Sequence, residues 1–466
     1  MTGQSTGNGT DKPHQSPRIR TLRRWQLAFV TVSLAFSLGS CGDASPDDER
    51  VAIRYWEKWT GFEGDAIRTI VDDFNASQDR IRVEITTVSD INRKLMLATA
   101  GGVPPDVAGI WASDIPVFAE NNALRPLDNL AEEKGIGRED YINIFWYLCS
   151  HRGHLWALPS TPATTALIWN KKLFREAGLD PEKPPRSIAE LEAFNEKLIK
   201  WRPDGSIQSF GHLPEEPGWW NALWGGWFGG RPSVGDRTIT IETPENIAAY
   251  QWVESYPKRF GAEQLVSFRD GFGNFASPQN AFFTGRVAMV MQGAWIYNFI
   301  KNYAPADFEW GVAPFPSVDP DRLKDVTVAE CDALVIPAGT RHPREAFEFL
   351  HYVNSQGPME KLCLLQRKFT PLHEVSEEFF DSHPNPYIQE FAALARSENV
   401  LTTPRLTTWS EFRSDMQNAV SRIWSGKATA EEALHDVQVR QQKILDQRVT
   451  RWDRHADELT EEWNNP

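Results

Sequence analysis

The sequence has 466 residues, of which 41% are hydrophobic and 24% are charged, and its formal net charge is −14. This length permits two or three domains with a large core, and the composition excludes wholesale disorder. The surplus of acidic residues disfavours nucleic acid and anionic lipid surfaces as partners.

The N-terminus has the pattern of a secretion signal. Several arginines precede the apolar run Leu27–Leu38, which is too short to cross a bilayer as a helix. Residues 1–40 are therefore predicted to be removed, which leaves a net charge of −18 because five basic residues and one acidic residue are lost. Leu38–Cys41 resembles a bacterial lipobox, so Cys41 is predicted to carry a lipid and residues 41–50 to form a polar tether. The alternative is an ordinary signal with an incidental cysteine.

The chain then begins with a βαβ pattern. Val51–Trp56 predicts a strand, Asp65–Asn75 a helix with one apolar face, and Ile81–Ile85 an alternating second strand. Ligands of such open sheets bind beyond the carboxyl ends of the strands. The loop after the first strand therefore makes Trp59 and Thr60 candidate ligand contacts, although Trp59 can equally cover the end of the sheet.

Val107–Trp111 predicts the next strand. Trp111 at its end and Asp114 just beyond are candidate sugar-binding residues. An indole face packs on the C–H groups of a sugar, and a carboxylate accepts hydrogen bonds from neighbouring hydroxyls. Asp114 is also well placed as a helix N-cap, since Pro116 follows two residues later.

The middle of the chain predicts a passage between two lobes. Leu155–Leu158 is a short apolar strand, Ser160–Thr165 is a polar linker and candidate hinge, and Ala166–Trp169 is a second β-prone run. Ser187 followed by Glu190 forms a capping box, which predicts a helix start.

The segment Pro214–Gly230 is unusually rich in tryptophan and glycine. Glycine lets a backbone approach a ligand closely, and tryptophan supplies rigid stacking area. Within this segment Glu216 with Trp219 or Trp220 is the predicted ligand-binding set, while the later tryptophans are expected in the core.

Further strands and helices follow. Val287–Met291 predicts a buried strand, after which Trp295 is a stacking candidate, and Phe308–Pro316 predicts a return strand. Val326–Pro337 is expected to re-enter the first lobe, and the C-terminal part, roughly Ser376–Trp463, is expected to be helical, with Trp409 as a late aromatic candidate. Thr429 followed by Glu432 forms a second capping box within this part.

Cys149, Cys331 and Cys363 follow the predicted cleavage site, and in an oxidising compartment one pair can bridge, although the sequence does not choose it. No two cysteines have metal-ligand spacing, and no nucleotide-binding, hydrolase or zinc-protease motif occurs. No metal, cofactor or catalytic residue is therefore predicted.

Five segments in order resemble the extracellular solute-binding proteins of ABC importers, specifically the sugar-binding group that includes maltose-binding proteins. They are Pro105–Val107 with Leu124–Asp128, Gly153–Leu198, Phe282–Met289 with Gly293–Trp295, Ala333–Pro337 with the helix around Phe347, and Ser425–Lys427 with Glu431–Leu434.

The resemblance implies a two-lobed periplasmic-binding-protein fold of type II, in the α/β class, with a mainly parallel sheet in each lobe and a hinge between them. The expected lobes are residues 51–160 plus 327–375 and residues 161–326 plus 376–466. Trp295 best matches the family's stacking position. Glu330 and Asp332 stand where the family often has glycines, which puts ligand contacts from that loop in doubt.

The implied function is that of a lipid-anchored, monomeric receptor on the extracytoplasmic side of a bacterial membrane. It would close its lobes on a mono- or oligosaccharide and present it to ABC permease subunits, without cofactor or catalysis. The alternative is a surface glycoside hydrolase or lyase with an acidic pair in a tryptophan-lined cleft. A non-sugar solute such as glycerol phosphate or a peptide is a further option.

Overall fold

The structure, a computed structural model, describes residues 49–464. The predicted signal segment, Cys41 and nearly all of the predicted tether therefore lie outside the described residues. The predicted βαβ start is confirmed: β1 (Val51–Glu57) pairs in parallel with β2 (Ile81–Thr87), and α1 (Gly61–Ser77) connects them. Ile67, Ile70 and Phe74 form the buried stripe of α1.

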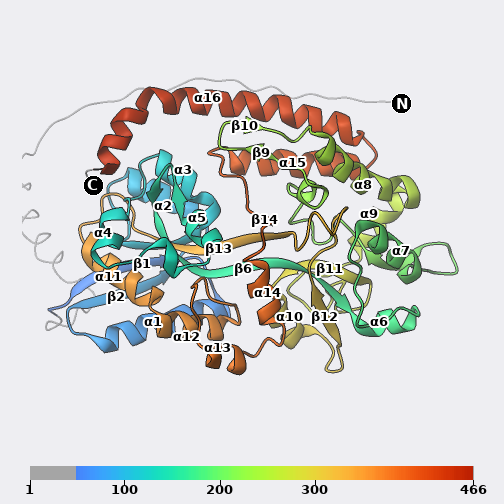
Figure 1. Cartoon of the computed structure of the whole chain (residues 1–466), viewed down its shortest axis with the longest axis horizontal. Coiled ribbons are helices and arrows are strands. Elements are labelled where there is room, and N and C mark those ends of the chain that lie inside the picture. Colours follow the sequence, from blue (N-terminus) through green and yellow to red (C-terminus); the bar gives the residue numbers. More distant parts are fainter. Residues whose placement is uncertain (1–48, 465–466) are drawn as a thin grey trace, which may run out of the picture. The chain divides into compact units, whose positions relative to one another are not determined.

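The first lobe is built on the parallel strands β2, β1 and β3 (Val107–Trp111), seen in blue on the left of Figure 1. Its other elements are α2 (Ile91–Ala100), α3 (Ile115–Glu120), α4 (Asp128–Glu133), α5 (Asn143–Cys149), β4 (Ser150–His151), β5 (His154–Leu155), α11 (Pro343–Asn354) and α12 (Gln356–Gln366).

Two long strands connect the lobes, and the expectation that Ser160–Thr165 is a linker outside regular structure was wrong. The predicted polar linker Ser160–Thr165 is part of a single strand, β6 (Ala157–Asn170), which pairs antiparallel with β13 (Thr327–Val335). The polar residues are buried because their hydroxyls find partners: Thr161 donates to Asp332, and Thr164 donates to a backbone carbonyl. Crossing between lobes therefore occurs within sheet rather than in a loop.

The second lobe continues the same sheet in the order β6, β11, β8, β7. Its strands are mixed in direction, since β11 is parallel to β8 but antiparallel to β6, so it is less parallel than expected. Its elements are α6 (Lys171–Glu176), α7 (Ile188–Leu198), β7 (Lys200–Trp201), β8 (Ile207–His212), β9 (Ser233–Val234), β10 (Thr238–Ile239), α8 (Pro244–Phe260), α9 (Ala262–Asp270), β11 (Val287–Gly293), α10 (Ile296–Tyr303), β12 (Trp310–Ala313), α15 (Trp409–Trp424) and α16 (Ala430–Asn464).

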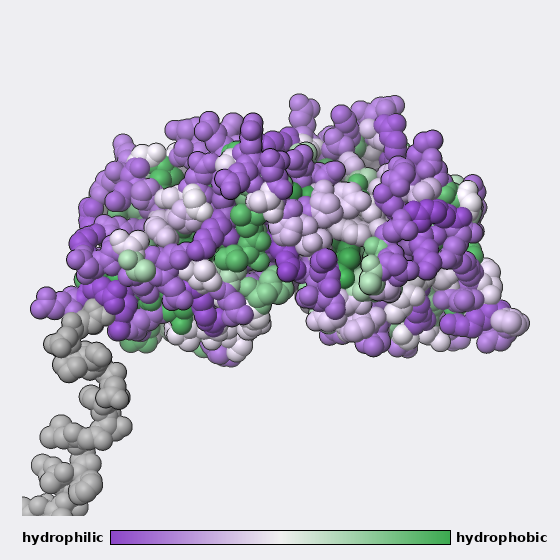
Figure 2. Space-filling model, turned by 90° about the horizontal axis from the view of Figure 1, so that it is seen from below, coloured by the Kyte–Doolittle hydropathy of each residue, from purple (hydrophilic) through white to green (hydrophobic). Residues whose placement is uncertain are grey.

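A third connection follows α13 (Glu377–Ser382) and α14 (Ile388–Leu394), where β14 (Val400–Leu401) pairs with β13 before the chain enters α15. Both predicted capping boxes have hydrogen bonds of the expected kind: the Ser187 hydroxyl accepts from the amide of Glu190, and Thr429 and Glu432 bond reciprocally. Seen from below, the surface is largely hydrophilic and has a notch between the two lobes (Figure 2).

Cys149, Cys331 and Cys363 are all buried free thiols, so none of the pairings left open by the sequence is formed. Within residues 49–464 no helix has the length and apolar character needed to span a bilayer.

Candidate ligand-binding site

A cavity of about 550 Å³ lies between the lobes and is lined by residues from both. The first lobe contributes the segments that follow β1 and β3, the second contributes the tryptophan-rich segment and the end of β11, and the crossing strands contribute Thr161 and Asp332. The cavity thus lies at the carboxyl ends of β1, β3 and β11, where open α/β sheets bind ligands.

The first-lobe wall carries two of the predicted tryptophans. Trp59 and Trp111 meet edge to face, with ring centroids 6.1 Å apart. Trp59 is fixed because its indole N–H donates to Asp332 at 3.1 Å, whereas Trp111 is 41% exposed and is available for stacking.

The opposite wall of the cavity, in the second lobe, carries three more of the predicted tryptophans. Trp295 lies 6.3 Å from Trp219 and 6.4 Å from Trp220, measured between ring centroids. Trp220 is nearly buried and donates to the carbonyl of Met291, while Trp219 is 48% exposed. The Trp295 indole donates to the buried side chain of Gln292, which holds its orientation.

Of the remaining predicted residues, Asp114 and Trp409 also line the cavity. Asp114 is the N-cap residue of α3, but its side chain makes no capping bond and instead accepts from Asn92 at 2.7 Å. Thr60 and Glu216 do not line the cavity. Thr60 is exposed at the start of α1, and the carboxylate of Glu216 lies 3.7 Å from Arg269 in an ion pair away from the cavity.

A buried charge network supports the floor of the cavity. The carboxylate of Asp332 lies 3.0 Å from the ammonium of Lys58 and 3.5 Å from that of Lys368, which in turn lies 2.9 Å from Glu63. Burial opposes ionisation of Asp332, but the two ammonium groups outweigh it and hold its pKa below the usual range. Sequence reasoning missed Lys58 and Lys368, since no local pattern marks them.

Glu330 is the second acidic group that β13 contributes to the lining. Burial raises the pKa of its carboxyl to about 7, although the charge of Arg413 acts in the opposite direction. Burial likewise raises the pKa of Asp114. Glu330 and Asp332, at which the sequence left ligand contacts in doubt, both line the cavity.

Two buried polar side-chain atoms of the lining have no hydrogen-bond partner among the described residues. They are the hydroxyl of Thr403, on the segment between β14 and α15, and the amide oxygen of Asn92. Buried polar groups are normally paired, so these atoms suit a bound polar molecule. The described residues contain no cluster of His, Cys, Asp and Glu arranged to hold a metal ion.

The profile of the family "Bacterial extracellular solute-binding protein" matches residues 63–360, more than half of the chain. The chain belongs to this family. The solute-binding protein is also similar to "sn-glycerol-3-phosphate-binding periplasmic protein UgpB" of Pectobacterium atrosepticum, with 20% identity over 90% of this chain and 96% of that protein. The corresponding protein of Escherichia coli K12 is 21% identical over 90% and 97%.

Two solved structures have a similar fold. "CpMnBP1 with Mannobiose Bound" has a TM-score of 0.72 and 25% identity and covers 84% of this chain and 99% of its own. "The sugar-binding protein MalE from the phytopathogen Xanthomonas citri" has a TM-score of 0.71 and 19% identity, covering 86% and 99%. The predicted two-lobed α/β fold is thus confirmed, and this solute-binding protein is an extracytoplasmic binding component of the ABC-importer type rather than an enzyme.

Proposed function

We propose that this solute-binding protein captures a mono- or oligosaccharide in the aromatic cavity and presents it to the permease of an ABC importer. The observation that carries the proposal is that indoles from two separate lobes line one cavity, with Trp111 on one wall and Trp219 and Trp295 on the other. Sugar rings offer apolar C–H faces to indoles and hydroxyl groups to polar side chains.

The proposed contacts divide by chemistry. Exposed indole faces pack on the sugar rings. Asp114 and Glu330 accept hydrogen bonds from hydroxyls, and Thr403 and Asn92 use their unpaired oxygens. Because the groups belong to both lobes, a bound sugar stabilises the closed arrangement by its differential affinity for it.

The charge of the lining favours an uncharged sugar over a phosphorylated solute. Four carboxylates line the cavity (Glu63, Asp114, Glu330 and Asp332) against two cations (Lys368 and Arg413), and Lys368 already bonds to Glu63 and Asp332. Lys58, which lies beneath the lining, is likewise paired with Asp332, so a phosphate would meet four acidic side chains and two lysines that are already bonded to carboxylates. The relatives named for sn-glycerol-3-phosphate make that solute the natural comparison.

Titration of the mature protein with mannobiose, maltotriose and sn-glycerol 3-phosphate tests the proposal. Thermal shift and tryptophan fluorescence should respond to a sugar and not to the phosphate, because a ligand bound only by the folded state raises the melting temperature. The sugar should be recovered intact. A response to the phosphate alone would overturn the proposal.

We further propose that the protein acts as a monomer held at the membrane by a lipid on Cys41. Expression of the full chain with Cys41→Ala should move the protein from the membrane fraction to the soluble extracytoplasmic fraction, since a lipid chain and not a helix would be the anchor. Retention of the variant at the membrane would refute the lipid anchor, and size-exclusion chromatography with light scattering tests the monomer.

A further inference from the structure

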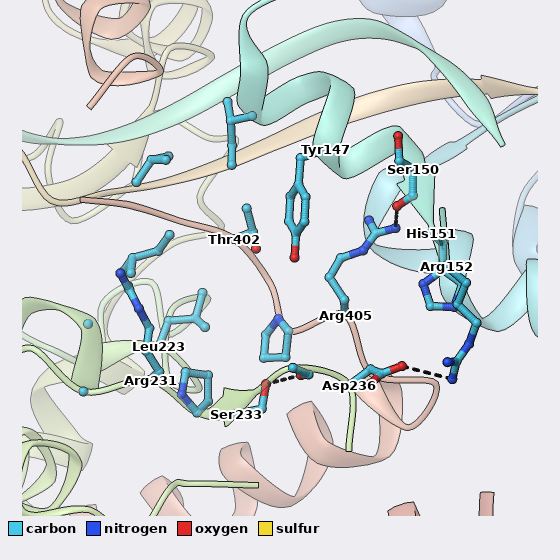
Figure 3. Close-up of a pocket in the computed structure, with 18 residues that line it drawn as sticks. Tyr147, Ser150, His151, Arg152, Leu223, Arg231, Ser233, Asp236, Thr402 and Arg405 are labelled. Atoms are coloured by element: carbon cyan, nitrogen blue, oxygen red, sulfur yellow. Dashed lines mark hydrogen bonds and ion pairs between the residues drawn. The ribbon is translucent and has the colours of Figure 1, made fainter. Parts of the chain in front are cut away.

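A second cavity, of about 560 Å³, adjoins the aromatic cavity and is lined by other parts of the chain (Figure 3). It is bordered by α5, by the turn between β4 and β5, by the β9–β10 hairpin and by the segment that follows β14. Of the described residues, only Leu223 lines both cavities. The volume is within the range of small-molecule sites, and the charge of the lining indicates which class of molecule would fit.

The charged lining residues are Arg152, Arg231, Arg405 and Asp236. Arg152 is compensated, because its Nε donates to Glu120 at 2.8 Å and its Nη2 lies 3.0 Å from the carboxylate of Asp236. The ring of His151 bonds to Glu120 at 2.9 Å, and burial lowers its pKa, so it adds no charge at neutral pH. The other two arginines form no ion pair with a carboxylate of the described part of the chain. The cavity therefore has two uncompensated cations, in a chain whose net charge is −14.

Arg405 is a buried cation, with only 8% of its surface exposed. Its Nη1 and Nη2 donate to the main-chain carbonyls of Leu148, at 2.5 Å, and Ser150, which fixes the guanidinium without neutralising its charge. Burial lowers the pKa of this guanidinium, and none of the groups that oppose this effect is a carboxylate. Buried arginines are normally paired with an anion. Since a guanidinium has five N–H donors, Arg405 has donors left for such a partner.

Arg231 and Tyr147 supply further donors. The main-chain carbonyl of Arg231 accepts hydrogen bonds from Thr240 and Asn246, which hold this residue in place, but its guanidinium bonds to none of the described residues. The hydroxyl of Tyr147 is likewise unbonded among them, and the ring, 52% exposed, has its centroid 5.7 Å from the Arg405 guanidinium. Figure 3 shows Tyr147 pointing into the cavity, with Arg231 on one side of it and Arg405 on the other.

Much of the remaining lining is apolar. It includes Ile144, Leu223, Leu401 and Pro404. An anion that fills the cavity would therefore have a hydrocarbon part as well as a charged group. A carboxylate suits these surroundings better than a phosphate, because it brings one negative charge rather than two into a partly apolar space. Its two oxygens also match the paired N–H donors of a guanidinium.

We propose that this cavity is a second ligand-binding site, which takes an organic carboxylate with an apolar body. The guanidinium groups of Arg231 and Arg405 and the hydroxyl of Tyr147 donate hydrogen bonds to the carboxylate. The apolar body packs against Leu223 and Leu401. None of the indoles that line the aromatic cavity takes part, so the site is independent of the proposed sugar-binding function.

Isothermal titration with 2-naphthoate and with its neutral analogue 2-naphthamide tests the site. The wild type should bind the acid at least about tenfold more tightly than the amide, because only the acid forms charge-assisted hydrogen bonds. Added salt should weaken binding of the acid. Arg231→Met and Tyr147→Phe should each weaken it about threefold to tenfold by removing one donor. Both side chains are exposed, so these variants should fold, whereas Arg405 also holds main-chain carbonyls.

The matched control is Arg237→Met, which removes the same charge from the β9–β10 turn without changing the lining, since Arg237 pairs with Asp453 at 2.7 Å. It should leave binding of the acid unchanged. The site would be overturned by no binding of the acid, by equal affinity for acid and amide, or by equal losses in Arg237→Met and Arg231→Met. Binding that is lost in Trp219→Ala and kept in Arg231→Met would also overturn it, by placing the acid in the aromatic cavity. Tighter binding of 2-naphthyl phosphate than of the acid would overturn the assignment to carboxylates.

Discussion

The indole of Trp295 lies against the backbone of Gly293, so closely that a Cβ atom at residue 293 would come within 2.3 Å of the ring carbon Cζ3. Any side chain there would push the ring away. Glycine at the end of β11 is therefore what allows Trp295 to lie on the second-lobe wall of the aromatic cavity.

Gly293→Ala should accordingly lower sugar affinity without touching the sugar itself. The displaced Trp295 ring would lose its stacking contact, which is worth about 1 kcal/mol or about fivefold in affinity, and Trp295→Ala should lose at least as much. Isothermal titration measures both. Gly357→Ala is the control, because an added Cβ at residue 357 meets nothing within 4 Å. Unchanged affinity in both Trp295→Ala and Gly293→Ala would remove Trp295 from the site.

Substitution of Trp219 should affect sugar binding, whereas substitution of Trp220 should mainly affect the stability of the fold. Trp219 is 48% exposed, so Trp219→Ala should weaken binding and leave the melting temperature nearly unchanged. Trp220 is nearly buried and donates to the carbonyl of Met291, so Trp220→Ala should cost about 3 kcal/mol of unfolding free energy. Chemical denaturation and titration of both variants check this, and equal stability losses would contradict it.

Several features were predictable because they depend on local patterns. The strand ending at Trp111 and the capping boxes at Ser187 and Thr429 follow from periodicity and short-range spacing, and the structure has them. The position of a tryptophan just after a strand is likewise predictable from the sequence, and Trp59 and Trp295 follow predicted strands in this way.

The features that could not be predicted from the sequence depend on contacts between distant parts of the chain. Ser160–Thr165 has the composition of a linker, and only its hydroxyl partners on β13 and in α14 show that it is part of a strand. Glu216 has a suitable local setting, but Arg269 pairs with it from another element. Lys368 reaches the cavity only because α12 brings it beside Glu63 and Asp332.

Asp332→Asn should destabilise the fold. The change leaves Lys58 and Lys368 buried with one carboxylate fewer, and breaking such a network typically costs about 3 kcal/mol. The folded-state pKa of Asp332 is below its usual value, so its contribution is present at neutral pH and is lost as pH falls through the acid range. Urea unfolding at neutral and acid pH checks both. Asp65→Asn, in an exposed pair with Arg68, is the control and should change stability by less than about 0.5 kcal/mol.

The contribution of Glu330 to stability should depend on pH in the opposite direction to that of Asp332. Its folded-state pKa is raised to about 7 from an ordinary value of 4.5, so the folded state keeps the proton longer than the unfolded state does. Each rise in pH between these two values therefore lowers the free energy of unfolding. Relative to Glu330→Gln, the wild type should lose about 2 kcal/mol between about pH 5 and about pH 8. Denaturation curves of the two proteins at matched pH measure the difference, and parallel pH profiles would show that Glu330 does not titrate in this range.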